Sequence, residues 1–257
     1  MIIIGFLVIL GLVLGSFATM LTHRLVHEKD PIFRRSHCPS CSHPLGILDL
    51  IPLVSYLYLK GSCRYCHARI PYFYWAIELL MPLTYVIIFI HYELTWLALK
   101  LLIFMTAMII LFFTDLLARI LPNPITIPLI LLGLIFSIFE QTFMSCLWGT
   151  IAGFGIYFLI GVVAEFIFKR PSMGGGDMKL GAAVGAFWGL KICGLTIYLS
   201  FILGGILSVF LILFKLKRRQ DYIPFGPSII LAYIIIWIYE IPIWTYFFPP
   251  SFPPHAL

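Results

Sequence analysis

The chain has 257 residues, of which 61% are hydrophobic and 11% are charged, and its formal net charge is +6. A soluble domain carries about 25% charged residues, so this composition excludes an ordinary soluble protein and favours an integral membrane protein. In such a protein the excess of positive charge serves to orient the chain in the bilayer. We therefore expect the lipid bilayer, and no nucleic acid, as a partner.

Eight apolar segments are candidates for membrane-spanning helices, each of which needs about 20 residues. We expect spans at residues 2–22, 75–90, 95–113, 123–139, 144–168, 178–190, 192–214 and 223–247. The stretch 180–214 is too long for one crossing, and Gly189-Leu190-Lys191 offers a break. No cleavable signal peptide is expected, because Met1 leads directly into Ile2-Ile3-Ile4 without a basic segment. The predicted fold class is an all-α polytopic membrane protein with about eight transmembrane helices.

Lysine and arginine residues collect on one side of this predicted topology. Eight spans place these basic residues together: Arg24, Lys29, Arg34, Arg35, Lys60, Arg64, Arg69, Arg119, Lys169, Arg170, Lys179, Lys215, Lys217, Arg218 and Arg219. Lys100 and Lys191 are the exceptions. Because the basic side of a membrane protein faces the cytosol, both termini are expected outside.

Residues 23–73, called the insert below, form the one sizeable polar stretch. Two pairs of cysteines lie in it: Cys38 with Cys41, and Cys63 with Cys66. Two such C-x2-C pairs offer four sulfurs to a tetrahedral zinc ion. Disulfides are the alternative, but a cytosolic face disfavours them. A segment this small also has difficulty folding without a cross-link, so we predict a zinc-ribbon-like insert with structural zinc.

Two aspartates are the candidate catalytic residues. Asp115 ends the third expected span and Asp177 opens the sixth, so the charge pattern places both at the cytosolic face. An aspartyl protease uses one ionised carboxylate to activate water and one protonated carboxyl group to polarise the scissile carbonyl. Carboxylates at membrane boundaries are costly and usually functional. The two residues therefore predict an intramembrane aspartyl peptidase.

The segment around Asp177 is the candidate active-site and substrate-binding loop. Gly174, Gly175 and Gly176 precede it, and Lys179 follows it. Three glycines permit positive φ and a close approach of a substrate strand. The structural alternatives are that Asp177 caps a helix and that Asp115 is solvated or pairs with Arg119. Gly181, Gly185 and Gly189 follow at four-residue spacing, which is typical of close helix packing in membranes.

Nearly the whole chain resembles the prepilin peptidase family, which combines leader peptidase and N-methyltransferase activities in type IV pilus, type II secretion and competence systems. The resemblance rests on motifs in a fixed order: Gly15-Ser16-Phe17, Arg24-Leu25, both cysteine pairs, Asp49-Leu50-Ile51-Pro52, Gly61, Tyr74, Glu78, Asp115 with Leu121-Pro122-Asn123 and Thr126, Gly174-x-Gly176-Asp177-x-Lys179, and Pro224-Phe225-Gly226-Pro227. Two departures are Thr19, where the family often has asparagine, and Val26, where proline is common.

The resemblance implies that Asp115 and Asp177 cut a glycine-ended leader from pilin or pseudopilin precursors. It also implies methyl transfer from S-adenosylmethionine to the new N-terminus, and a place in the bacterial inner membrane with the active site facing the cytosol. The family motifs do not mark the S-adenosylmethionine site. Residues 61–66 and Glu78 are candidate contacts, and a purely structural role is the alternative. The expected division is a first transmembrane helix (1–22), a cysteine-rich domain (23–73) and a peptidase membrane domain (74–257).

Four other classes compete with this interpretation. A preflagellin-type peptidase without methyltransferase activity would lack the cysteine-rich insert. A presenilin-type protease usually has tyrosine before its first aspartate, where this chain has Thr114. A transporter would show repeated halves, and no repeat is evident. A zinc-ribbon scaffold would tolerate Asp115→Asn and Asp177→Asn.

Overall fold

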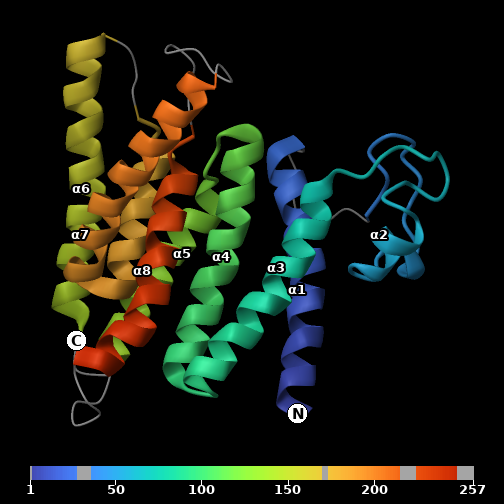
Figure 1. Cartoon of the computed structure of the whole chain (residues 1–257), viewed down its shortest axis with the longest axis horizontal. Coiled ribbons are helices and arrows are strands. Elements are labelled where there is room, and N and C mark those ends of the chain that lie inside the picture. The colour runs from blue at the N-terminus through green and yellow to red at the C-terminus, as the bar shows by residue number, and fades with distance from the viewer. Residues whose placement is uncertain (1, 28–35, 170–172, 215–223, 248–257) are drawn as a thin grey trace. The chain divides into compact units, whose positions relative to one another are not determined.

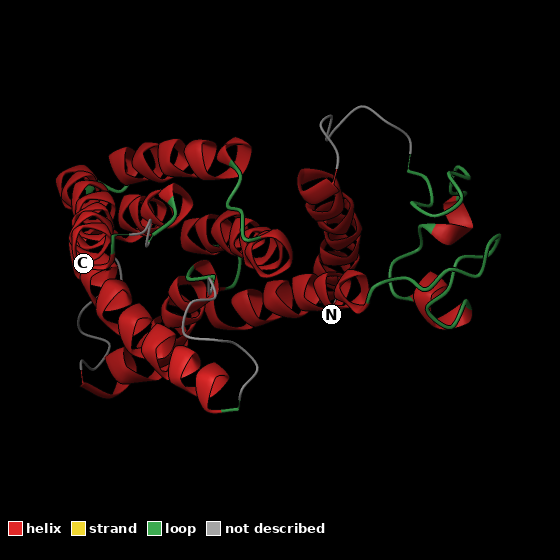
Figure 2. Ribbon diagram, turned by 90° about the horizontal axis from the view of Figure 1, so that it is seen from above, coloured by secondary structure: helices red, strands yellow, loops and turns green. Residues whose placement is uncertain are grey.

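The structure is a computed structural model that describes residues 2–27, 36–169, 173–214 and 224–247. It divides into two compact units, residues 1–118 (unit 1) and 119–257 (unit 2). The described residues form helices and loops without a β-strand, as Figure 2 shows. This confirms the all-α class.

Unit 1 contains three long helices: α1 (Ile2–His27), α3 (Tyr72–Tyr92) and α4 (Trp96–Ala118). All three are long and apolar enough to cross a membrane. α1 and α3 pack closely because glycines of α1 face the backbone of α3. A Cβ atom on Gly11 would lie 2.5 Å from Pro82 Cα, and one on Gly15 would lie 3.1 Å from Glu78 Cα. Figure 1 shows α1 and α3 side by side, with the insert connecting their upper ends.

Unit 2 contains α5 (Asn123–Phe139), α6 (Phe143–Phe168), α7 (Gly175–Leu213) and α8 (Gly226–Phe247). α6 and α7 are long enough to span, whereas α5 and the apolar part of α8 are shorter. α7 packs against α5, α6 and α8 and is thus the central helix of the unit. It bends at Gly189, where φ is 76° and ψ is −177°, outside the helical region.

The predicted spans correspond to these helices, with differences at their ends. The two spans predicted at 178–190 and 192–214 are the two arms of the bent α7, and the bend falls within the predicted Gly189-Leu190-Lys191 break. α1 continues five residues past the predicted end at residue 22, because no glycine or proline interrupts the helical sequence before Pro31. The number of membrane crossings stays a prediction. Some residues of the topology argument lie outside the described residues: Lys29, Arg34, Arg35, Arg170, Lys215, Lys217, Arg218, Arg219 and Ile223.

The insert contains two short helices, η1 (Ile47–Asp49) and α2 (Val54–Tyr58), between its two cysteine pairs. Figure 2 shows them as short red helices among green loops. Between residues 36 and 71, all described, only Cys38 and Cys63 are buried. The insert therefore has no hydrophobic core of its own.

Candidate functional site

The two cysteine pairs form turns with the same hydrogen bonds. In the first, the backbone N–H of Cys38 donates to His43 O at 3.0 Å, and Ser42 N–H donates to Cys38 O at 2.8 Å. The same bonds recur at the second pair: Cys63 N–H donates to Ala68 O at 2.9 Å, and His67 N–H donates to Cys63 O at 3.0 Å. The insert is therefore a pair of matching knuckles. The sequence hid this repeat because only the cysteine spacing is shared.

The four predicted cysteines converge on one point. The Sγ atoms of Cys38, Cys41, Cys63 and Cys66 all lie within 4.8 Å of one another, and Cys38 Sγ is 3.8 Å from Cys66 Sγ. Zn–S bonds of about 2.3 Å would separate the sulfurs of a tetrahedral site by about 3.8 Å. All four are free thiols in the structure. The cluster can thus bind a metal ion, and its spacing fits zinc.

The thiols influence one another's ionisation. Burial raises the pKa of the Cys38 thiol, but hydrogen bonds from the backbone of Cys41 and Ser40, together with those from the Cys63 and Cys41 thiols, lower it to about 7. The backbone at Ala68 lowers the pKa of Cys66, whereas Cys41, Cys63 and Cys38 raise it, and the result is about 11. Crowded thiols ionise in separate steps. A bound cation removes this competition because it favours the thiolate in every ligand.

Two carboxylates hold the insert, one from within it and one from α3. The Asp49 carboxylate at the end of η1 forms an ion pair with Arg64 of the second knuckle, with 2.8 Å between Oδ1 and Nε. Glu78 of α3 accepts a hydrogen bond of 2.7 Å from the backbone N–H of Leu53 at the start of α2. The motif residues Asp49 and Glu78 therefore have structural roles that the sequence did not reveal.

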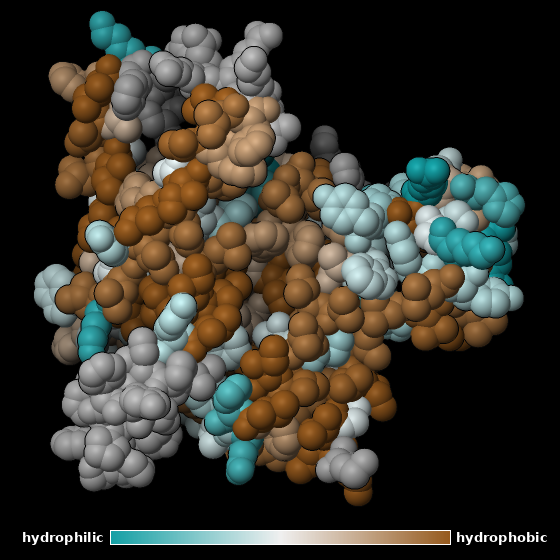
Figure 3. All heavy atoms as spheres, in the orientation of Figure 1, coloured by the Kyte–Doolittle hydropathy of each residue, from teal (hydrophilic) through white to brown (hydrophobic). Residues whose placement is uncertain are grey.

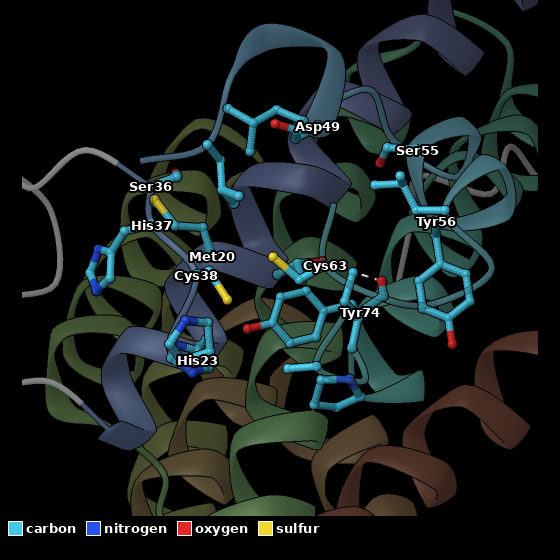
Figure 4. Close-up of a pocket in the computed structure, with 18 of the residues that line it drawn as sticks. Met20, His23, Ser36, His37, Cys38, Asp49, Ser55, Tyr56, Cys63 and Tyr74 are labelled. Carbon is cyan, nitrogen blue, oxygen red and sulfur yellow. Dashed lines mark hydrogen bonds between the residues drawn. The ribbon is translucent and has the colours of Figure 1, made fainter. Parts of the chain in front are cut away.

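A cavity lies between the insert and the helices α1 and α3. Figure 4 shows residues from all three elements around it: Met20 and His23 of α1, Cys38 and Cys63 of the knuckles, and Tyr74 of α3. Its lining also carries charged side chains of both signs: Arg24, Asp49, Arg64, Arg69 and Glu78. Of the predicted contact segment 61–66, Cys63 and Arg64 line the cavity, and Glu78 does so too. The cavity can accommodate a polar, charged small molecule.

Asp177 is buried in the first turn of α7, with 3% of its surface exposed. The alternative role of helix N-cap is wrong, because Gly174 is the N-cap of α7. The expectation of positive φ in the glycine run is also wrong. Gly174 has φ of −74°, and Gly175 and Gly176 belong to the helix. The strong helical context of residues 175–188 overrides the freedom of these glycines.

Gly176 serves a close contact instead. A Cβ atom there would lie 2.7 Å from Leu121 Cβ, so only glycine lets this turn of α7 lie against the segment before α5. Lys179 Nζ donates a hydrogen bond of 2.6 Å to Asn123 Oδ1 at the start of α5. Gly175 has open space around it. Unit 2 thus brings Leu121-Pro122-Asn123 and the Gly174–Lys179 segment together.

Asp115 lies in the last turns of α4 and is also buried, with 4% of its surface exposed. A buried carboxyl group is costly and is retained where it has a function. Asp115 belongs to unit 1 and Asp177 to unit 2. The pairing of the two carboxylates therefore stays a prediction.

Sequence reasoning missed several cavity residues, among them His23, Tyr56 and Tyr74. Tyr74 and His23 are ring neighbours with centroids 6.0 Å apart. The sequence marks Tyr74 only as part of a family motif, and the predicted end of the first span at residue 22 leaves His23 in the insert. The signal for His23 was available, because it continues the uninterrupted helical sequence of α1.

Comparisons with known proteins agree with these observations. Residues 9–92 match the family described as "Bacterial Peptidase A24 N-terminal domain", and residues 102–209 match "Type IV leader peptidase family". No solved structure matches the chain.

Three relatives, each named "Prepilin leader peptidase/N-methyltransferase", illustrate the similarity. That of Vibrio cholerae is 34% identical over 89% of this chain and 94% of its own length. That of Aeromonas salmonicida is 34% identical over 77% of this chain and 69% of its own. That of Bacillus subtilis is 29% identical over 92% of this chain and 94% of its own. On this identity and coverage, the chain is a multi-pass membrane protein that belongs to the type IV leader peptidase family.

Proposed function

We propose that this chain is an aspartic endopeptidase that removes the leader peptide from type IV prepilin-like precursors, and that it N-methylates the new N-terminal residue. One observation carries the proposal. The leader peptidase match covers residues 102–209, which contain both buried aspartates, Asp115 and Asp177. The relatives' names, which join both activities, support the same assignment.

In the proposed reaction Asp115 and Asp177 act as the catalytic pair. One carboxylate takes a proton from the attacking water while the other carboxyl group donates a hydrogen bond to the scissile carbonyl. Two carboxyl groups held close together share one proton, because both cannot easily carry charge at short range. Gly174, which caps α7, and Gly175, Gly176 and Lys179 in its first turns form the segment that receives the substrate. The open space at Gly175 leaves room for the substrate backbone beside Asp177.

The membrane setting follows from the charges and the family. The substrates are pilin or pseudopilin precursors, whose leaders are basic. We place the protein in the bacterial inner membrane, with the aspartates facing the cytosol and both termini outside. The excess of basic residues on one side of the predicted topology supports this orientation.

Zinc bound by Cys38, Cys41, Cys63 and Cys66 has a structural role in this proposal. The four sulfurs fill a tetrahedral site and leave no open position for substrate. The near absence of buried side chains in the insert supports the role, since such a segment needs a cross-link to stay folded. Binding energy of such a site is folding energy.

S-adenosylmethionine would bind in the cavity of unit 1. When bound, it supplies a methyl group on a positively charged sulfonium. The lining residues suit each part of the molecule: arginines for its carboxylate, tyrosine rings for its adenine, and the Glu78 carboxylate for positive charge. Arg24 and Tyr74 reach the cavity from the two helices that hold the insert. These residues bind and orient the methyl donor and the new amine, and correct positioning supplies much of the rate.

The whole proposal is tested with purified protein, a prepilin and S-adenosylmethionine. We expect loss of the leader together with a gain of one methyl group on the new N-terminus, both followed by mass spectrometry. Leader loss without methylation would leave the peptidase assignment standing and refute the methyltransferase. Intact prepilin after incubation with folded protein would refute the peptidase.

The cofactor site has its own test, in which binding is measured directly. Met20→Trp fills the cavity from α1, whereas Val13→Trp adds the same side chain at an exposed position of α1 that does not line the cavity. Equilibrium dialysis with labelled S-adenosylmethionine should show binding weakened about tenfold or more by Met20→Trp, as expected for a blocked pocket. Val13→Trp should bind normally. Equal binding by both variants would place the cofactor elsewhere.

A further inference from the structure

The insert carries a group of large apolar side chains that are exposed and are not buried within the insert. They are Ile47, Leu48, Leu50, Ile51, Val54, Leu57 and Tyr58, called the apolar edge here, and their exposed fractions run from 38% for Ile51 to 86% for Ile47. All belong to η1, α2 or the turn between them. Exposed apolar groups of this size mark a surface that contacts a membrane or a protein.

Figure 3 shows where these side chains gather. Brown, apolar side chains follow the lower edge of the insert, and teal, hydrophilic ones cover its upper and outer faces. Within unit 1 the lower edge is the side that extends along the helices α1 and α3. The apolar edge therefore faces the depth of the spans rather than away from them.

A hydrogen bond fixes the depth of the apolar edge relative to α3. Leu53, the residue before α2, donates its backbone N–H to Glu78 Oε2 at 2.7 Å. Glu78 lies six residues after Tyr72, the first residue of α3. At 1.5 Å per residue this is about 9 Å into the helix. Amphipathic segments that lie on a membrane bury their apolar face about 5–10 Å into the boundary between headgroups and acyl chains.

Aromatic residues give an independent marker of this level. Tyr72 and Trp75 in the first turn of α3 are 71% and 38% exposed. Tyrosine and tryptophan concentrate at the headgroup level of membrane proteins. Glu78 comes about one turn after Trp75. Leu53, which is hydrogen-bonded to Glu78, and the apolar edge beside it therefore lie just below the headgroups, on the acyl side.

The charges of the insert complete the pattern. Lys60, two residues after α2, and Arg69, which follows the second knuckle, are exposed. Asp49, by contrast, is ion-paired with Arg64. Basic side chains beside an apolar surface favour anionic lipid headgroups by about 1 kcal/mol each. A lipid leaflet matches this combination of apolar edge and basic flank.

We propose that the apolar edge of the insert is embedded in the lipid leaflet beside α3, at the boundary between headgroups and acyl chains. The insert is then a membrane-surface domain with two anchors, the Leu53–Glu78 hydrogen bond and the apolar edge. Its cavity, which lies on the same α1–α3 surface, stays at the membrane boundary, where a membrane-anchored substrate presents its N-terminus. The binding of lipid does not depend on the proposed activities.

The test uses the full chain in nanodiscs of phosphatidylcholine and phosphatidylglycerol. A photoreactive benzoylphenylalanine replaces Ile47 or Leu57 of the apolar edge, and Tyr65 serves as control because it is 47% exposed but lies in the second knuckle. After irradiation without substrate, mass spectrometry measures the protein carrying one lipid. We expect lipid adducts at both edge positions, with yields about tenfold above those at Tyr65, as burial in the acyl boundary requires.

Other outcomes overturn the proposal. Adducts with a second copy of the chain would make the edge a dimer surface, and adducts that form only with added prepilin would make it a substrate groove. A folded, monodisperse protein without lipid adducts at both positions would equally contradict it. A variant with Ile47→Glu and Leu57→Glu, crosslinked from position 54, should lose the adduct, whereas Tyr65→Glu should keep it.

Discussion

The insert and the α6–α7 pair hold functional residues in opposite ways. In the insert only Cys38 and Cys63 are buried between residues 36 and 71, all of which are described. In α7, by contrast, residues 180–187 are buried without interruption. The insert has a cluster of four cysteines in place of a core, whereas this stretch of α7 is held by close packing within unit 2.

Glycines make the packing of α7 possible. A Cβ atom on Gly185 would lie 2.1 Å from Gly149 O, and one on Gly153 would lie 2.3 Å from Gly181 O. The predicted spacing of Gly181, Gly185 and Gly189 is confirmed as a close helix contact, and α6 supplies the matching glycines. The comparison teaches that a short polar segment depends on a cross-link, whereas a membrane helix depends on the fit of its backbone. We therefore expect the insert to unfold when its cross-link is lost, and unit 2 to be destabilised when the backbone contact of α7 is disturbed.

The largest effect is expected when the chemistry is removed and the packing is kept. Asp177→Asn and Asp115→Asn should each lower leader cleavage by about 10³-fold or more, because general acid–base catalysis supplies about 10²–10⁴-fold. Cleavage of a prepilin is followed on gels and by mass. Glu165→Gln, which changes an exposed carboxylate of α6, is the control and should cleave normally. Near wild-type processing of the prepilin by either aspartate variant would refute the aspartyl mechanism.

Removal of one cysteine ligand should unfold the insert and leave the helices intact. Cys63→Ser should lose the bound zinc, roughly one ion per chain, because a structural site needs all four ligands. Elemental analysis measures the metal, and limited proteolysis should cut between residues 36 and 71. Cys146→Ser, at a buried cysteine of α6, should retain the metal. Zinc retained after serine replaces all four knuckle cysteines would refute the site.

Gly185→Ala should destabilise unit 2 and leave the metal content unchanged. The added methyl group meets the backbone of α6, and overpacking of this kind costs about 1–3 kcal/mol. Thermal unfolding in detergent measures the loss. Gly194→Ala in the same helix has open space and should be neutral or slightly stabilising. The contact would be unimportant if both variants unfolded at the same temperature.

The smallest effect is expected at the Lys179–Asn123 hydrogen bond. Asn123→Ala or Lys179→Met removes this exposed link between α5 and α7. We expect a three- to tenfold decrease in cleavage, in line with about 1 kcal/mol for a typical hydrogen bond. Lys191→Met, at an exposed lysine elsewhere on α7, is the control. No difference between Lys179→Met and this control would leave the bond without a role in cleavage.

Much of the fold could be predicted because the apolar segments that form membrane helices can be recognised from the local sequence. The eight predicted spans correspond to seven helices, two of the spans being the arms of α7, because length and hydropathy mark such helices. The predicted Gly189-Leu190-Lys191 break contains the bend. The absence of positive φ in Gly174–Gly176 could not be predicted, because helix continuation there overrides residue preference. The end of α1 differs from the prediction although the uninterrupted helical sequence marks it. The convergence of Cys38, Cys41, Cys63 and Cys66 followed from their spacing.

The cavity depended on information that no single segment carries. Its residues come from α1, the two knuckles and α3, and they are brought together by tertiary contacts such as Leu53 with Glu78. Likewise, the roles of Asp49 and Gly176 became visible only through their partners Arg64 and Leu121. The family motifs located these residues in the sequence without giving the physical reason for them.

The central claim is that proteolysis depends on Asp115 and Asp177 while methylation depends on the insert and its cavity. The most direct test supplies already cleaved, unmethylated pilin and S-adenosylmethionine to an Asp115→Ala, Asp177→Ala double variant. We predict that this variant methylates the pilin at close to the wild-type rate although it cannot cleave prepilin. A folded double variant that fails to methylate cleaved pilin would show that the aspartates serve both reactions, and would contradict the claim.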